Sequence, residues 1–223
     1  MADQTERRTR SATAPLSYLL YLPPAYADDG PEWPLVVFLH GRGESGHDLA
    51  RVKLHGIARV IDEAVDEAAG FPAVVVSPQC PEGTDWERQT GAVWELIQEV
   101  CETHRIDRRR IYLTGLSMGG RGSWKLAVEH PDAFAAIAPI CGRIPQVDDF
   151  LTKVQVLKGV PIWVFHGVLD PIVPVENSDR IVASLTAAGA AVRYTRYPDA
   201  DHDAWTRTYA DPALYHWLWA KER

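Results

Sequence analysis

The sequence has few cysteines and no long apolar run. Its three cysteines, Cys80, Cys101 and Cys141, cannot all pair, and none belongs to a Cys-x-x-Cys spacing of the kind that binds zinc. No stretch approaches the roughly 18 apolar residues that a membrane-spanning helix needs. We therefore expect free thiols, no bound metal, no membrane span and a cytoplasmic location.

Positive charge is also scarce. The 223 residues carry a formal net charge of −7, so the protein as a whole does not attract phosphate backbones. The one basic cluster, residues 105–110, is interrupted by Ile106 and Asp107, and we interpret it as a solvated surface at the end of a helix. The charge therefore indicates no nucleic-acid partner.

The N-terminal segment, residues 1–14, is polar and contains three arginines, and no apolar run follows them before Pro15. This pattern is unlike a secretory signal peptide, and we expect a disordered lead-in. The chain as a whole is 46% hydrophobic and 24% charged, which is ordinary globular usage. Because residues 15–223 contain no repeat and no low-complexity linker, we expect them to form a single domain, as a monomer or a homodimer.

Short apolar runs alternate with helical patterns along the rest of the chain. The predicted strands are residues 16–22, 35–39, 73–76, 111–114, 135–140, 162–165 and 192–197, and the predicted helices are residues 54–69, 90–103, 117–129, 176–188 and 211–221. This alternation predicts an α/β fold with a mostly parallel sheet and helices on both faces. The longest connections, residues 41–53, 77–89 and 141–160, are too short for a substantial lid.

A glycine-rich motif, Gly115-Leu116-Ser117-Met118-Gly119, joins a predicted strand to a predicted helix. The pattern Gly-x-Ser-x-Gly is typical of a nucleophile elbow, because small flanking residues let the serine backbone adopt a strained turn. The motif therefore predicts Ser117 as a nucleophile. The alternative is a serine that only caps the following helix.

A serine nucleophile needs a histidine base, and four histidines follow Ser117 in the sequence. His130 ends the same predicted helix, and His216 lies inside the last one. His166 is the last residue of a strand. His202 lies on a polar loop after the last strand, where ligands and catalytic groups gather in open parallel sheets. Position therefore favours His202 as the base, with a surface histidine as the alternative.

The orienting carboxylate is predicted to be Asp170. It lies on a loop after a predicted strand. It also completes the chain order Ser, Asp, His that accompanies a nucleophile elbow of this type. The alternative role is that of a turn aspartate before Pro171. Asp201 and Asp203 flank His202 too closely to reach its far ring nitrogen with ease.

The predicted reaction also needs an oxyanion hole. One donor is the backbone N–H of Met118, because it follows the nucleophile at a helix N-terminus. The second donor is expected in the glycine-rich loop of residues 40–46, which follows an early predicted strand.

These motifs resemble those of the small, single-domain α/β-hydrolase carboxylesterases, which include peptidase-like and phospholipase/carboxylesterase-like proteins. The matching segments are residues 39–44, 77–81 with Trp86, 112–120, 139–142, 166–174 and 202–205. The resemblance implies an α/β-hydrolase fold with a minimal lid and a triad of Ser117, Asp170 and His202. It implies oxyanion donors from Met118 and Arg42. At the position of Arg42, members of the family usually carry an uncharged residue. It also implies ester hydrolysis without a metal or a cofactor.

The expected substrate is a small or medium carboxylic ester. Trp86 and Trp205, together with Trp124, are candidates for the walls of its pocket, although most of the eight tryptophans are expected in the core. Two alternatives have the same fold but cleave a different bond: a thioesterase would cleave a thioester, and a serine peptidase would cleave an amide. A further alternative is a binding protein that has lost turnover.

Overall fold

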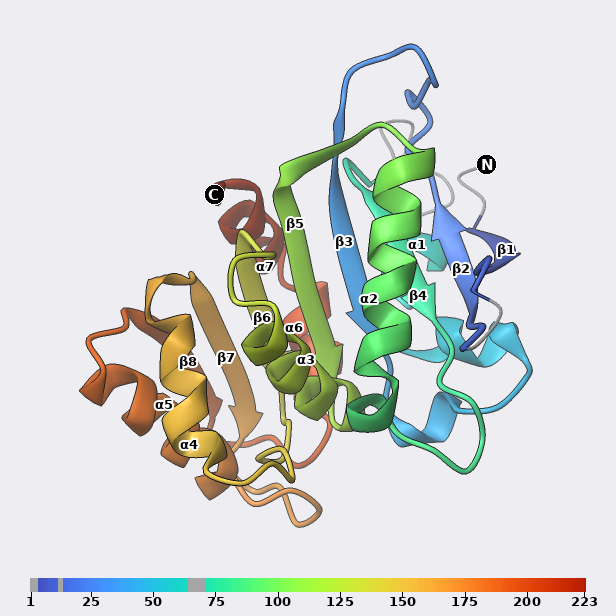
Figure 1. The fold of residues 1–223 in the computed structure, drawn as a ribbon. Helices are drawn as coiled ribbons and strands as arrows, with labels where there is room; N and C mark the ends of the chain where they lie inside the picture. The colour runs from blue at the N-terminus through green and yellow to red at the C-terminus, as the bar shows by residue number, and fades with distance from the viewer. Residues whose placement is uncertain (1–3, 12–13, 64–70) are drawn as a thin grey trace.

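The computed structural model describes residues 4–11, 14–63 and 71–223 of the chain. An eight-stranded sheet forms its centre, in the order β1-β2-β4-β3-β5-β6-β7-β8 (Figure 1). The strands are β1 (Gln4–Arg8), β2 (Ser17–Tyr21), β3 (Trp33–Leu39), β4 (Val74–Pro78), β5 (Ile106–Leu116), β6 (Ala136–Ile140), β7 (Ile162–Gly167) and β8 (Val192–Tyr197). The pairs β1–β2 and β2–β4 are antiparallel, and the pairs from β4 to β8 are parallel. The predicted, mostly parallel sheet is confirmed.

Helices cover both faces of the sheet. The helices are η1 (Arg42–Glu44), η2 (Leu49–Leu54), α1 (Gly56–Glu63), α2 (Trp86–Thr103), α3 (Met118–Glu129), α4 (Phe150–Lys153), η3 (Val154–Gly159), α5 (Glu176–Ala187), α6 (Trp205–Ala210) and α7 (Pro212–Trp219). Figure 1 shows α2 and α3 in front of the sheet and α6 and α7 behind it. No described helix is both long and apolar enough to cross a membrane.

Strand β3 shows why the sheet is covered by helices on both faces. Leu35 and Val37 pack into the core on the side of α2 and α3, while Val36 and Phe38 pack into the core on the side of α1 and α6. Successive side chains of a strand point to opposite faces, so a continuous apolar run is buried only when both faces are covered. The run in β3 is therefore the local reason for the three-layer arrangement.

The N-terminal segment differs from the expected disorder. Residues Gln4–Arg8 form β1, which pairs with β2 from Gln4 opposite Tyr21 to Arg8 opposite Ser17. The buried Gln4 side chain also donates a hydrogen bond to the Ala58 carbonyl at 2.7 Å. The reason is that an edge strand is held by backbone hydrogen bonds to its neighbour, so it does not need an apolar run of its own. Residues 1–3 and 12–13 lie outside the described residues.

Two helices begin or end differently from the prediction. Helix α2 begins at Trp86, four residues before the predicted start, because the Asp85 carboxylate accepts the Arg88 N–H and caps it. Part of the predicted helix over residues 54–69 is α1, which follows η2, and residues 64–69 lie outside the described residues. Helix α6 was not predicted at all.

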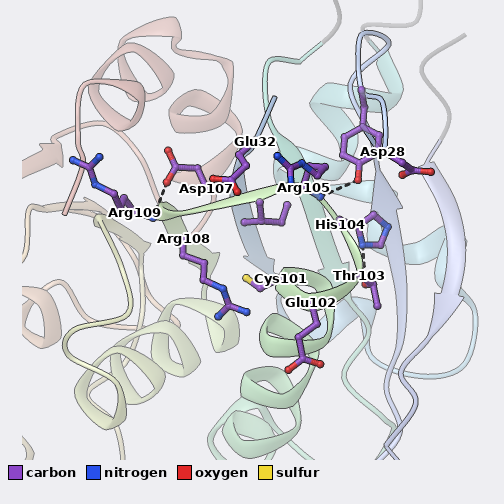
Figure 2. Close-up of a pocket in the computed structure, with 12 residues that line it drawn as sticks. Asp28, Glu32, Cys101, Glu102, Thr103, His104, Arg105, Asp107, Arg108 and Arg109 are labelled. Atoms are coloured by element: carbon purple, nitrogen blue, oxygen red, sulfur yellow. Dashed lines mark hydrogen bonds between the residues drawn. The ribbon is translucent and has the colours of Figure 1, made fainter. Parts of the chain in front are cut away.

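The basic cluster of residues 105–110 directly follows the C-cap of α2, His104, as the interpretation of a surface at a helix end expects, and its residues from Ile106 on begin β5. It lines a hollow of about 590 Å³ at the amino end of that strand. Arg105, Arg108 and Arg109 line this hollow together with Asp28 and Glu32 (Figure 2). Because acidic and basic side chains are mixed in this hollow, the cluster is a solvated surface of mixed charge.

Candidate active site

Ser117 lies at a strained turn between β5 and α3. Its backbone angles are φ 52° and ψ −111°, a conformation that non-glycine residues rarely adopt. The neighbouring glycines make the turn sterically feasible. A Cβ atom at Gly119 would overlap the Leu39 carbonyl oxygen, and one at Gly115 would lie 2.6 Å from the Gly119 carbonyl carbon. The turn therefore needs glycine on both sides of the serine.

Ser117, His202 and Asp170 form a chain of hydrogen bonds. The Ser117 Oγ lies 2.9 Å from His202 Nε2, and His202 Nδ1 lies 2.6 Å from Asp170 Oδ2. The Asp170 side chain is completely buried, and that of His202 is 18% exposed. Because an ionised carboxylate can only accept hydrogen bonds, Nδ1 is the donor to Asp170. Nε2 is then free to accept the Ser117 hydroxyl proton.

The loop after β7 holds the Asp170 carboxylate in place. Its Oδ1 accepts the backbone N–H groups of Ile172 at 2.9 Å and Val173 at 2.8 Å. Asp203, next to His202, instead accepts hydrogen bonds from the backbone N–H and the hydroxyl group of Thr206, in the first turn of α6. The structure therefore assigns these aspartates to different tasks.

Two backbone N–H groups in the loops around Ser117 have no hydrogen-bond partner among the described residues. Arg42 is the first residue of η1 and Met118 is the first residue of α3. Neither N–H donates a hydrogen bond to any described residue. The loop before Arg42 packs against the end of β5, since a Cβ at Gly41 would lie 2.8 Å from the Leu116 side chain. Free N–H groups at such a place can receive a developing negative charge.

The sequence agrees with this geometry across most of the chain. The family model described as Phospholipase/Carboxylesterase matches residues 25–214. The chain belongs to this family. A crystal structure of a thermostable esterase superposes with a TM-score of 0.81 at 34% identity, covering 99% of this chain and 64% of that one. The α/β-hydrolase fold implied by the resemblance is thus confirmed.

Two relatives show the range of names in the family. NocK of Nocardia uniformis subsp. tsuyamanensis, named as a candidate esterase, is 29% identical over 194 residues, or 84% of this chain. The chain spans only 55% of the length of NocK. Acyl-protein thioesterase 1 of Gibberella zeae is 25% identical over 195 residues, covering 76% of this chain and 83% of that protein.

Within this family member, His40 supports the loop that carries Arg42. Its Nδ1 lies 2.5 Å from the Gly41 carbonyl oxygen, and its Nε2 accepts the Cys80 N–H at 2.9 Å. The ring is therefore neutral, with its proton on Nδ1, and burial lowers the pKa of His40 to about 4. The sequence placed His40 only in a glycine-rich loop, because its partner Cys80 lies 40 positions away and becomes a neighbour only in the fold.

The three tryptophans that were predicted as pocket walls have different positions, and Trp124 is wholly buried in the core, so its prediction was wrong. Trp86 is wholly buried, and its indole N–H donates to the His40 carbonyl at 2.9 Å, so it supports the loop and does not face a substrate. The prediction for Trp86 was therefore wrong. Trp205 is partly exposed, with its ring edge-on to His202 at 5.2 Å between centroids. Its buried Nε1 has no partner among the described residues.

Two further polar residues missed by the sequence analysis lie behind Trp205. The His55 ring is 5.7 Å from the Trp205 ring, and His55 Nε2 is 4.0 Å from Glu44 Oε1. Burial raises the pKa of the Glu44 carboxyl. These residues extend the buried polar region from His202 toward the Arg42 loop.

Among the described residues, one group could be considered for a metal. Ligand atoms of Cys141, Asp170 and His202 lie within 4.8 Å of one another. However, Asp170 and His202 already bind each other, and burial raises the pKa of the Cys141 thiol well above its usual range. The donor set is therefore poorly suited to a resident cation.

Proposed function

We propose that this protein is a serine carboxylesterase that cleaves small or medium carboxylic esters through an acyl-enzyme. The observation that carries the proposal is the hydrogen-bonded chain of Ser117, His202 and Asp170 beside two unpartnered N–H groups. The membership of the phospholipase/carboxylesterase family supports the same reaction.

In the proposed mechanism, His202 accepts the Ser117 hydroxyl proton as Oγ attacks the ester carbonyl carbon. The N–H groups of Arg42 and Met118 hold the oxyanion. The protonated His202, oriented by Asp170, then gives its proton to the leaving alcohol, and the acyl group stays on Ser117. A water molecule, deprotonated by His202, attacks the acyl-enzyme and releases the carboxylic acid. The reaction needs no metal and no cofactor.

The proposed substrate size rests on the surroundings of Ser117. Trp205 offers an aromatic wall beside His202. Leu169 and Ile172 flank the Asp170 loop and are 62% and 59% exposed, so they offer apolar contacts at the same edge. Short connections bearing such side chains suit a modest acyl or alcohol group better than a long polymer.

The deciding experiment measures hydrolysis of short p-nitrophenyl esters by the wild type and by Ser117→Ala. We expect the variant to lose hydrolysis and to escape labelling by a fluorophosphonate probe, which reacts with activated serines. Turnover near the wild-type rate in a folded Ser117→Ala protein would overturn the proposal. Wild-type protein that neither hydrolyses nor labels would favour the binding-protein alternative.

The similarity to an acyl-protein thioesterase supports a second candidate, a thioesterase that uses the same residues. An ester, a thioester and an anilide with one common acyl group separate the candidates. The carboxylesterase proposal expects the highest kcat/KM for the ester, and preference for the anilide would instead indicate a peptidase.

We further propose that the protein works in the cytoplasm as a monomer or a homodimer, with residues 15–223 in one domain. The three free cysteines, two of them buried, suit a reducing compartment. Cell fractionation tests the location, analytical ultracentrifugation tests the oligomeric state, and limited proteolysis tests the domain.

A further inference from the structure

His166 is a completely buried histidine that lies against the same Asp170 oxygen, Oδ2, as His202. It lies in β7, four residues before Asp170. Its Nε2 is 2.8 Å from the Val173 carbonyl oxygen and 3.2 Å from Asp170 Oδ2, and its Nδ1 is 2.7 Å from Ser178 Oγ. The proposed mechanism makes no use of this ring.

The partners of His166 determine where its proton is. A carbonyl oxygen can only accept a hydrogen bond, so Nε2 carries the proton and points it at Val173. The same N–H faces Asp170 Oδ2 at the longer distance. Nδ1 is therefore the acceptor, and the Ser178 hydroxyl donates to it. Burial lowers the pKa of His166, which agrees with a neutral ring.

With this assignment, donors surround both oxygens of the Asp170 carboxylate. Oδ1 accepts the N–H groups of Ile172 and Val173, and Oδ2 accepts His202 Nδ1–H at 2.6 Å. His166 Nε2 also approaches Oδ2 to 3.2 Å, while its N–H is bound to the Val173 carbonyl. A completely buried carboxylate is costly unless its lone pairs are satisfied, and a neutral ring beside it adds no competing positive charge.

His166 also restrains the loop that positions the carboxylate. Val173 donates its N–H to Asp170 and accepts the His166 N–H with its own carbonyl, so one residue links the two side chains. Ser178, in the first turns of α5, holds the other side of the ring. The ring thus connects β7, the Asp170 loop and α5.

We propose that His166 is a positioning residue for the hydrolysis, whose N–H, bound to the Val173 carbonyl, holds the Asp170 carboxylate in the plane that orients His202. This inference rests on the proposed function, because it assigns His166 a role only if Asp170 orients the base. A histidine that merely fills the core would contribute stability and leave kcat unaffected once the protein is folded.

The test compares His166→Leu, which fills the space without a donor, with His166→Gln, which keeps an N–H near the Nε2 position. We expect the leucine variant to lower kcat at least 10-fold with KM within twofold, and the glutamine variant to recover most of the loss. Equal losses in both variants, or a folded leucine variant with kcat within threefold of wild type, would overturn the inference.

A double-mutant cycle with Asp170→Asn separates this inference from the proposed function. If His166 acts through Asp170, His166→Leu should lower kcat less than threefold in the Asp170→Asn background. A full 10-fold effect in that background would contradict the positioning role. An active Asp170→Asn single variant would instead contradict the proposed function itself.

Ser178→Ala keeps the inference testable if the leucine variant does not fold. Loss of this hydroxyl should loosen the ring and lower kcat about threefold with KM unchanged. Ser184→Ala is the matched control, because Ser184 lies on the same helix and donates to the Leu151 carbonyl, away from Asp170. Identical kcat values for the two serine variants would count against the role of His166.

Discussion

The two ends of strand β5 have opposite surroundings. At the carboxyl end, Ser117 has a strained backbone and is linked through His202 to the completely buried, hydrogen-bonded carboxylate of Asp170. At the amino end, Asp107 and Arg110 form a partly exposed ion pair beside the open hollow of Figure 2. Surface ion pairs typically contribute only about 0–1 kcal/mol, whereas a buried polar group left without its partner costs about 1–3 kcal/mol.

The difference between the two ends of β5 shows which polar residues carry chemistry. Both ends of β5 hold aspartates and basic side chains, so residue type does not distinguish them. What differs is burial, and burial restricts each side chain to one geometry. Substitutions at the carboxyl end should therefore change turnover, and matched substitutions at the amino end should not.

The largest expected effect is that of Asp170→Asn. The amide would favour the wrong tautomer of His202, so kcat should fall about 10³- to 10⁴-fold, as in serine proteases, while the circular dichroism spectrum stays native. Steady-state kinetics on a p-nitrophenyl ester measure this loss. A kcat within 10-fold of the wild type would move the orienting role to another residue.

The next effect tests the Arg42 N–H. Proline at this position removes the donor, and the site tolerates it because Gly41 is extended (ψ 179°) and position 42 is the first residue of a helix. We expect Arg42→Pro to lower kcat about 10²-fold. Arg42→Ala, which keeps the N–H, should stay within about fivefold, and equal losses in the two variants would place the second oxyanion donor elsewhere.

A smaller effect concerns stability and pH at His40. Its folded pKa of about 4 lies below the ordinary value of 6.5, so the associated stability is complete above pH 6.5 and is lost as the pH falls toward 4. Between pH 8 and pH 5 the wild type should lose about 2 kcal/mol of unfolding free energy that His40→Gln does not lose. Urea denaturation at both pH values measures the difference. The exposed His47→Gln variant is the control, and parallel pH curves for wild type and His40→Gln would contradict the assignment.

The smallest effect is expected at the amino end. Asp107→Asn removes the ion pair with Arg110, whose atoms lie 2.6 Å apart, yet it should change the free energy of unfolding by about 1 kcal/mol at most. Its kcat/KM should stay within twofold of the wild type. A larger kinetic loss would show that the two ends of β5 are coupled, which would break the comparison.

Local patterns predicted much of the fold and the central residues of the site. The elbow at Ser117 can be predicted because a strand, a glycine-rich turn and a helix follow one another in the sequence. His202 and Asp170 could be selected because loops after parallel strands meet at one edge. Strand β1 escaped prediction, since its stability comes from pairing with β2 and not from its own side chains.

Other residues could not be assigned from the sequence. From the sequence, His166 could be considered only as a candidate base, because its distance to Asp170 depends on how β7, the following loop and α5 pack together. Trp86 was expected at the pocket for its aromatic character, but the Asp85 cap makes Trp86 the first residue of α2, and the buried indole donates its N–H to the His40 carbonyl.

The sequence by itself determined the alternating elements and the identity of Ser117, since hydrophobic period and turn chemistry act over a few neighbouring residues. Only the tertiary structure decided which side chains surround the Asp170 carboxylate, which N–H groups remain free and which tryptophan faces His202. The physical reason is that burial and hydrogen-bond geometry depend on residues far apart in the sequence, such as Ser117 and His202, which are 85 positions apart. Such distances are not encoded in any local pattern.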